Sequence, residues 1–354
     1  MPIIIKSTGK ALPKKCVTND ELPKELDTSD EWIFSHTGIH SRYIAGEGET
    51  CGTLGTDACL FALKAAGVTA AEVGLIICAT ATPVYNGFPS TACIIQAALG
   101  AVNATCFDVT AACSGFLYAM DIAASMMERG GCKYALIVGA EVLSKICNWK
   151  DRTSCILFGD GAGAALLERC EPTEAVGKFG AGAASGAASD GYGEADTSSS
   201  AGIGVVESVT DKASCGAGIG KFISGSDGTG GNALYVAPEG FMKMDGHAIY
   251  TFAVKIMTEI ISGLMEKENL KPSDVDYFVC HQANARILSA AAKRLELDMN
   301  KFVMTLSEYG NTSSASIPLT LADMDSQGKL KKGTTIVTAA FGAGLTWAGT
   351  VIRF

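Results

Sequence analysis

Charged residues are scarce in this sequence. Asp, Glu, Lys and Arg make up 18% of its 354 residues, against about 25% in typical soluble domains. A chain with so little charge and 48% apolar residues is expected to cover part of its surface, most simply with a second copy, so we expect a homodimer. The 28 basic and 37 acidic residues give a net charge of −9. Because no basic tract is long enough to follow a phosphate backbone, nucleic acid is not expected as a partner.

Long apolar runs are also missing. No stretch of about 18 uninterrupted apolar residues occurs, and the N-terminal MPIIIKSTGK lacks the order of charge, apolar run and cleavage site that marks a secretion signal. We therefore expect a soluble, cytoplasmic protein with no membrane segment. At roughly 100–200 residues per domain, the length predicts two domains or one large duplicated unit.

Paired cysteines and clustered histidines are absent too. The thirteen cysteines are odd in number, form no C-x-x-C and are scattered from Cys16 to Cys280, which indicates reduced thiols. With four histidines in the whole chain, a metal site is not expected. The glycine-rich stretches 159–164 and 216–221 match neither a phosphate-binding loop nor a dinucleotide fingerprint, which argues against a nucleotide hydrolase or a nicotinamide dehydrogenase.

Short β-branched runs alternate with helical patterns along most of the chain. Such an alternation is typical of an α/β protein whose strands pair in parallel and are covered by helices. The predicted strands are 75–80, 106–110, 134–142, 164–168, 277–282, 334–341 and 349–354. The predicted helices are 58–67, 89–100, 114–130 and a long amphipathic helix over 246–270.

The two parts of the chain resemble each other. VTAAEVGLIICAT (68–80) aligns with LKPSDVDYFVCHQ (270–282), and FGDGAGAALLE (158–168) is similar to FGAGLTWAGTVIRF (341–354). These similarities suggest an internal duplication, although short repeats also arise by chance among α/β proteins. The predicted organisation is an N-terminal half at 1–175, a Gly/Ser-rich connecting insert at 176–240 and a C-terminal half at 241–354.

Cys113, in DVTAACSGFLYAM, is the first candidate for chemistry. A predicted strand turns there through small residues directly into a helix, whose unpaired N–H groups and positive dipole end favour a thiolate. The small neighbours leave room for a substrate carbonyl. The alternative is a buried cysteine that acts only as a small apolar side chain.

Further candidates lie in the second part of the chain. His281 ends a predicted strand in FVCHQANARIL, where α/β active sites collect; the alternative is a histidine that only satisfies a helix start. Asn311 lies in EYGNTSSASIPLTL, and an asparagine after glycine most often just forms a turn. In TAAFGAGLTW, Gly342 and Gly344 allow the backbone to approach a ligand closely.

Taken in order, AACSGF, CHQAN, YGNTSSASIP and AFGAGLTW resemble the β-ketoacyl-acyl-carrier-protein synthase III family of condensing enzymes. The resemblance covers nearly the whole chain, from LDTSDEWIFSHTGIHSRYIA (26–45) through FPSTACIIQ (88–96) and KDRTSCILFGDGAGA (150–164) to the final RF. It implies a thiolase-like fold with a duplicated, five-layered α/β/α/β/α architecture, usually as a homodimer.

The resemblance assigns the chemistry to three side chains. Cys113 would take an acyl group from an acyl-CoA primer, and His281 and Asn311 would serve the decarboxylation of malonyl-acyl carrier protein. The backbone N–H groups of Cys113 and Ala343 would form the oxyanion hole. The implied function is a decarboxylative Claisen condensation that initiates fatty acid synthesis. No cofactor is implied, because loss of carbon dioxide drives the formation of the carbon–carbon bond.

Binding residues are also implied by the resemblance. Trp32 would stack on one face of the CoA adenine and Arg152 on the other. Without the resemblance, Trp32 would be interpreted as a helix-packing aromatic and Arg152 as a member of a surface ion pair. Phe88 resembles the residue that limits the acyl pocket from across the dimer. Arg286, Lys293 and Arg294 would form a basic patch that binds the acidic carrier protein. The alternative is an ordinary solvated helix face.

Three departures from the family pattern are visible. His36 stands where arginine commonly precedes TGI, so that CoA phosphate contact is not carried over to this chain. Ala343 replaces a more usual glycine, and its backbone N–H remains available. The stretch 184–240 is longer than in typical members and is expected to form a flap over the acyl pocket. The chain length of the primer stays open.

Other functions remain as alternatives. A related condensing enzyme of secondary metabolism, with a longer or β-oxo acyl donor, would share the same site. A cysteine hydrolase also uses Cys, His and Asn in this order, but its local signature C-G-[SA]-C-[WY] is absent. A thiolase would normally add a second cysteine near FGAGLTW, which has none. A non-catalytic interaction module would have no packing need for these residues.

Overall fold

The computed structural model describes residues 1–170 and 217–354. The predicted boundary between residues 175 and 176 therefore lies outside the described residues, as does most of the predicted insert and of the predicted flap. The chain enters a β-strand at Gly218, directly after the part that is not described.

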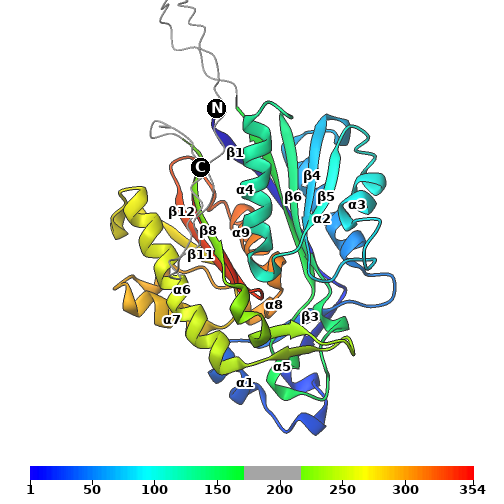
Figure 1. Ribbon diagram of the computed structural model, residues 1–354, viewed down its shortest axis with the longest axis vertical. Helices are drawn as coiled ribbons and strands as arrows, with labels where there is room; N and C mark the ends of the chain where they lie inside the picture. The colour runs from blue at the N-terminus through cyan, green and yellow to red at the C-terminus, as the bar shows by residue number, and fades with distance from the viewer. Residues whose placement is uncertain (171–216) are drawn as a thin grey trace, which may run out of the picture.

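Five strands form the first sheet, in the order β1-β7-β6-β4-β5 (Figure 1). β4 is parallel to β5 and β6, whereas β7 is antiparallel to both β6 and β1. Among the described strands, the edge strand β5 has β4 as its one neighbour. The strands are β1 (Ile3–Ala11), β4 (Val73–Ala79), β5 (Thr105–Val109), β6 (Tyr134–Glu141) and β7 (Gly161–Arg169).

The second sheet has four strands, in the order β11-β12-β13-β8. β11 and β12 are parallel, and β13 is antiparallel to both β12 and β8. The strands are β8 (Gly218–Ser226), β11 (Tyr277–Cys280), β12 (Thr335–Gly342) and β13 (Thr346–Arg353). Two small antiparallel pairs complete the described strands: β2 (Lys15–Thr18) with β3 (Ser41–Ile44), and β9 (Leu234–Val236) with β10 (Met242–Met244).

All seven predicted strands are present, as β4, β5, β6, β7, β11, β12 and β13. The expectation of parallel pairing holds only for the pairs within β5-β4-β6 and β11-β12 and is wrong for the rest. The reason is clearest at β12 and β13, which are joined by residues 343–345 alone, whereas a parallel crossover needs about a dozen residues or more. The edge strands β1 and β8 were not predicted from the sequence.

Both sheets repeat one topology, which confirms the duplication. In each sheet a pair of parallel strands (β4 and β6, β11 and β12) is followed by an antiparallel strand (β7, β13) and then by an antiparallel edge strand (β1, β8). β8 is thus the counterpart of β1. It lies within the predicted connecting segment but belongs to the second sheet.

Helices form three layers around the two sheets (Figure 1). α4 and α9 lie between the sheets, α2 and α3 cover the outer face of the first sheet, and α6 and α7 cover the outer face of the second. The layered helices are α2 (Cys51–Ala66), α3 (Thr91–Leu99), α4 (Gly115–Glu128), α6 (Gly246–Lys267), α7 (Ala285–Arg294) and α9 (Ser316–Ser326). These include the four predicted helices. The short helices are α1 (Asp30–Thr37), α5 (Arg152–Cys155) and α8 (Leu306–Tyr309).

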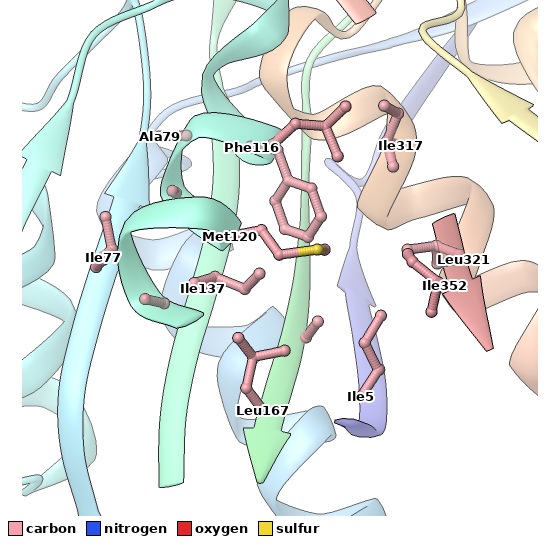
Figure 2. Packing of buried hydrophobic residues seen from close by; sticks show 14 of the residues in the cluster. Ile5, Ile77, Ala79, Phe116, Met120, Ile137, Leu167, Ile317, Leu321 and Ile352 are labelled. Carbon is pink, nitrogen blue, oxygen red and sulfur yellow. The ribbon is translucent and has the colours of Figure 1, made fainter. Parts of the chain in front are cut away.

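The central layer holds the largest apolar cluster. Phe116 and Met120 of α4 point between the two sheets, toward Leu321 of α9 and toward strand residues of both halves (Figure 2). Alternation along β4 divides its side chains between layers, because Ile77 faces this cluster while Ile76 faces α2 and α3. The active-site candidates lie at one end of this layer, where β5 runs into α4 and β12 runs into β13.

In the described part of the chain, α6 alone is long and apolar enough to span a membrane by length and composition. One face of this helix packs against the rest of the protein. Ile249, Ile256, Ile260 and Leu264 are buried in the cluster between α6, α7 and the second sheet. We therefore assign α6 to the core of the second half.

Candidate active site

Cys113 lies in a single turn of 3-10 helix, Ala112–Ser114, between β5 and α4. The preceding Ala112 has a φ of 44°, a left-handed conformation that costs free energy for any residue with a side chain. Gly342, at the end of β12, packs against this turn: a Cβ at Gly342 would lie 2.7 Å from the Cys113 nitrogen and 3.2 Å from the Ala111 oxygen. Only glycine at 342 allows the two halves to approach this closely.

The thiol of Cys113 is protected from solvent. Its residue is 8% exposed, and burial raises the pKa of the thiol to about 12, while Ser313 lowers that pKa and Glu141 raises it. This differs from the expected thiolate, because burial outweighs the stabilising groups of the turn. The other described cysteines are also free thiols.

His281 follows β11 and is 1% exposed. Its Nδ1 lies 2.8 Å from the Ser316 hydroxyl oxygen, and its ring meets the edge of Phe341 at a centroid distance of 5.4 Å. Burial lowers the pKa of the imidazole to about 3. The side chain is therefore neutral near pH 7, with its orientation fixed by Ser316.

Asn311 is held through both its backbone and its side chain. Its N–H donates to the Leu157 oxygen at 2.8 Å, and its carbonyl accepts from the Gly159 N–H at 3.0 Å, so the loop from the second half pairs with a loop from the first. The side-chain oxygen accepts from the Ser313 N–H at 2.9 Å. With this oxygen occupied, the amide Nδ2 is the group left to donate to a ligand.

The structure brings the three predicted catalytic residues to adjoining elements. The turn that carries Cys113 contacts the turn Ser313–Ala315, which follows Asn311. Ser316, the partner of His281, directly continues that turn into α9. Cys113 therefore comes from the first half, and His281 and Asn311 reach it from the second.

The predicted oxyanion donors also lie together. Ala343 follows Gly342, whose backbone packs on the nitrogen of Cys113. Among the described residues, the Ala343 N–H donates to no backbone acceptor, and the Cys113 N–H donates to the sulfur of its own side chain. Ala343 is not among the described residues with positive φ, so its side chain introduces no left-handed strain where the family more often has glycine.

Trp32 and Arg152 are neighbours, and the space between their side chains is too small for the predicted adenine. The guanidinium carbon of Arg152 lies 5.0 Å from the Trp32 ring centroid, whereas a ring between them needs about 7 Å. Arg152 also donates to the Asp27 carbonyl at 2.7 Å. His36 stacks on Trp32 at 4.2 Å. The predicted adenine contact thus requires Arg152 to move away from the indole.

The remaining predicted residues are at the surface. Phe88 is 91% exposed, so within one chain it closes no pocket. α7 presents its basic side chains to solvent. Asn284 caps the helix, because its side-chain oxygen accepts from the Arg286 N–H at 2.8 Å. The exposed basic residues of α7 are Arg286, Lys293 and Arg294.

Sequence reasoning missed Arg42, which is fully buried on β3. Its guanidinium donates to the Asn19 side chain and to the Ile156 carbonyl, both at 2.7 Å, and burial lowers its pKa to about 10. The stem of Arg42 packs where a Cβ at Gly310 would lie, at 3.3 Å. Arg42 thus supports the paired loops that hold Asn311, a role that no local motif signals.

Glu141 and the serines after Asn311 were missed as well. Glu141 ends β6 and is fully buried beside the Cys113 turn. A carboxylate that ends an apolar strand, in GAEV, was the available signal.

In the described part of the chain, no group of three or more His, Cys, Asp or Glu side chains is arranged to hold a metal ion.

The duplicated fold, together with a buried cysteine between two halves and a histidine and an asparagine behind it, defines a thiolase-like condensing enzyme. Two family models match: 3-oxoacyl-[acyl-carrier-protein] synthase III over residues 107–185 and the C-terminal part of the same enzyme over residues 265–354. The chain belongs to the β-ketoacyl-acyl-carrier-protein synthase III family.

Individual relatives agree over full length. The chain is 41% identical to the β-ketoacyl-[acyl-carrier-protein] synthase III of Caldanaerobacter subterraneus subsp. tengcongensis, covering 99% of this chain and 97% of the relative. It is 43% identical to that of Clostridium tetani, covering 99% and 98%. The crystal structure of the Aquifex aeolicus 3-oxoacyl-[acyl-carrier-protein] synthase III superposes with a TM-score of 0.83 at 37% identity, over 100% and 99% of the two chains.

Proposed function

We propose that this enzyme condenses an acyl-CoA primer with malonyl-acyl carrier protein through an acyl-Cys113 intermediate, and so initiates fatty acid synthesis. The observation that supports this most directly is the meeting of the two halves at Cys113. The backbone nitrogen of Cys113 lies against Gly342 and its thiol lies beside Ser313, within the same cluster as Asn311 and His281.

In the first half-reaction, the Cys113 sulfur attacks the thioester carbonyl of the acyl-CoA. A bond forms between this sulfur and the acyl carbon, the bond to the CoA sulfur breaks, and CoA leaves as its thiol with the proton from Cys113. Because the thiol is protonated near pH 7, its proton must leave as the sulfur attacks and reach the departing CoA sulfur. The N–H groups of Cys113 and Ala343 stabilise the oxyanion.

In the second half-reaction, malonyl-acyl carrier protein loses carbon dioxide and its thioester oxygen gains enolate charge. A neutral His281 and the Nδ2 of Asn311 are suited to donate hydrogen bonds to that oxygen. The enolate carbon then attacks the acyl carbon on Cys113, and the Cys113 sulfur leaves. Loss of carbon dioxide drives this step, so the proposal includes no metal or redox cofactor.

The proposed partners follow from exposed groups. Arg286, Lys293 and Arg294 give α7 a positive face for an acidic carrier protein, and Trp32 with Arg152 would bind the CoA adenine once Arg152 has moved. We further propose a homodimer formed at the open edge of β5, since Phe88 and the half-buried strand β5 are left uncovered in one chain. The reaction is assigned to the cytoplasm.

A related role in secondary metabolism remains the second candidate. The priming β-ketosynthase of the R1128 polyketide pathway superposes with a TM-score of 0.81 at 31% identity, over 99% of this chain and 96% of that one. The two roles differ in the acyl donor and not in the three catalytic residues.

Intact mass measurement tests the proposal. The protein is incubated with a panel of individual acyl-CoAs, with and without malonyl-acyl carrier protein. We expect a mass gain equal to a short acyl group, its loss on adding the carrier protein, and no gain in Cys113→Ala. Acylation only by long or β-oxo donors would favour the second candidate, and no acylation by any donor would contradict both.

A further inference from the structure

Glu141 is a buried carboxyl group that the proposed reaction does not use. It is fully buried at the end of β6, and no lysine, arginine or histidine of the described residues forms an ion pair with it. The titratable side chains that face it are three cysteines, Cys51 of α2, Cys78 of β4 and Cys113. A carboxyl group in such a place must be satisfied by hydrogen bonds alone.

One carboxyl oxygen of Glu141 accepts hydrogen bonds. Oε2 lies 2.7 Å from the Thr82 hydroxyl oxygen and 3.1 Å from the Ala81 nitrogen. The Thr82 hydroxyl itself accepts from the Val142 N–H at 2.9 Å, so its own proton points to Glu141. Oε2 therefore needs no proton of its own.

The other oxygen, Oε1, shares the Ala81 N–H at 3.2 Å and also meets a serine hydroxyl. Oε1 of Glu141 lies 2.7 Å from the Ser314 hydroxyl oxygen, and that same hydroxyl oxygen lies 2.8 Å from the Ala79 carbonyl oxygen. A serine hydroxyl has one proton, yet both short contacts need a proton between two oxygens. The Ala79 carbonyl has none to give. If Ser314 donates to Ala79, the second proton must sit on Glu141.

From this proton count we propose that Glu141 is held as a neutral carboxylic acid that donates to Ser314. Through this hydrogen bond it acts as a positioning residue for the turn Ser313–Ala315, whose Ser313 N–H holds the Asn311 side chain. The proton path is fixed: Glu141 Oε1–H to Ser314 Oγ, and Ser314 Oγ–H to the Ala79 oxygen. Burial raises the pKa of Glu141, while hydrogen bonds from Thr82, Ser314, Ala81 and Ser313 lower it.

The hydrogen bond between Glu141 and Ser314 matters for catalysis because Ser314 lies beside residues of the active site. Ser314 comes from the second half and is tied by it to the ends of β4 and β6 in the first. The adjacent Ser313 acts on the Cys113 thiol and donates its backbone N–H to the Asn311 side chain. Ser313 also has a φ of 49°, a left-handed conformation that persists only where surrounding contacts impose it. The catalytic part of this inference rests on the proposed function; the protonation of Glu141 does not.

The test uses the pH dependence of stability. Glutamate in the unfolded chain is ionised above about pH 5, so a folded state that keeps the proton on Glu141 is progressively disfavoured as pH rises toward the raised pKa. Glu141→Gln keeps a donor and an acceptor but has no proton to lose. From pH 6 upward, at one protein concentration, the ratio of the wild-type to the Glu141→Gln unfolding constant should rise with pH, by at most about tenfold per pH unit while the folded protein keeps the proton. A constant ratio would overturn the proposal.

Asp160 is the matched control. It is also fully buried, but its contacts are with donors: the Ala45 N–H at 2.7 Å, the Ser144 N–H at 2.9 Å and the Ser144 hydroxyl at 2.6 Å. Burial raises the pKa of Asp160 as well, so the difference between the two carboxyl groups lies in their contacts, and the same proton count assigns Asp160 as ionised. The ratio for Asp160→Asn should therefore stay constant over the same range, and a tenfold rise in this variant too would contradict the use of contact geometry to locate the proton.

Two further measurements separate protonation from catalysis. If Glu141→Gln fails to fold, infrared spectra of the wild-type protein with and without 13C-labelled glutamate should still show a protonated carboxyl band at pH 7, and absence of that band would overturn the proposal. Glu141→Leu should lower the rate of malonyl decarboxylation about tenfold, as expected for one lost buried hydrogen bond, and Glu141→Gln should restore most of it. Equal loss in both variants would overturn the positioning role and leave the proposed condensation intact.

Discussion

Gly342 and Cys113 touch through their backbones across the two halves of the protein. A Cβ at Gly342 would lie 2.7 Å from the Cys113 nitrogen, closer than real Cβ contacts come. Ala343, the second proposed oxyanion donor, directly follows Gly342. Backbone geometry at this point therefore governs both the nucleophile and the proposed oxyanion hole.

Gly342→Ala should slow acylation of Cys113 by about a hundredfold, because a displacement of about 1 Å in a catalytic group costs this much. Single-turnover transfer of a labelled acyl group measures the effect. Gly246→Ala is the control, since a Cβ there meets no atom within 4 Å and Gly246 has no positive φ. Near-normal acylation in Gly342→Ala would show that the contact is not needed.

The alkylation of Cys113 should depend steeply on pH. Since burial raises the thiol pKa to about 12, only the rare thiolate reacts at lower pH. The rate of modification by iodoacetamide should rise about tenfold per pH unit from pH 6 to 10 with no plateau. Peptide-resolved mass spectrometry separates Cys113 from the exposed Cys16 and Cys93. A plateau below pH 8 would instead indicate an activated thiolate, as the helix position alone suggests.

Trp32→Ala should raise the KM for acyl-CoA about three- to tenfold with little change in kcat, because stacking on an aromatic ring contributes roughly 0.5–1.5 kcal/mol. Steady-state kinetics with varied acyl-CoA measures this. His36→Arg should lower the same KM, since a permanent charge would then stand beside Trp32 where the family commonly has one. If neither variant changes KM, CoA does not bind at α1.

Charge reversal on α7 should affect one substrate only. Lys293→Glu with Arg294→Glu should lower kcat/KM for malonyl-acyl carrier protein about tenfold at low salt, and less at high salt because exposed charges are screened. Acylation by acyl-CoA should not change. Lys331→Glu, another exposed lysine, is the control. An equal loss in the control would indicate a general charge effect.

Phe88→Asp should weaken the proposed homodimer, because it places a charge where a large apolar side chain is 91% exposed in the single chain. Light scattering over a dilution series measures the fraction of dimer. Tyr235→Asp on β9, an exposed aromatic position in the other half, should leave the dimer intact. A wild-type protein that is monomeric at all concentrations would exclude this assembly.

Periodicity and spacing predicted the elements whose signals are local. The buried strands β4, β6 and β12 consist largely of apolar residues, and α4 and α6 carry apolar stripes. β8 escaped because three glycines and a lysine interrupt GIGKFISGS, so it lacks a continuous apolar run. Its place in the sheet is decided by β13, which lies more than a hundred residues further on.

The active-site residues also divide into those with a local sequence signal and those whose role depends on distant residues. Cys113, His281 and Asn311 stand in motifs at element ends, and these motifs were sufficient to single them out. Arg42 and Glu141 were not predictable in this way, because what matters about them is what surrounds them in space: full burial, and partners such as Ile156 and Ser314 that are distant in sequence. The shifted pKa of Cys113 has the same origin, since burial is a property of the folded chain.

Cys170 and Gly218, on either side of segment 171–216, both lie beside the N-terminal end of β1. The N–H of Cys170 donates to the Pro2 carbonyl at 3.0 Å, and a Cβ at Gly218 would lie 3.2 Å from the Ile3 oxygen. A short peptide would therefore bridge the halves, and the cost of closing a longer one grows only slowly with its length. The architecture consequently tolerates large changes in size at this junction, which makes it a natural point for grafting or trimming sequence without disturbing the chemistry.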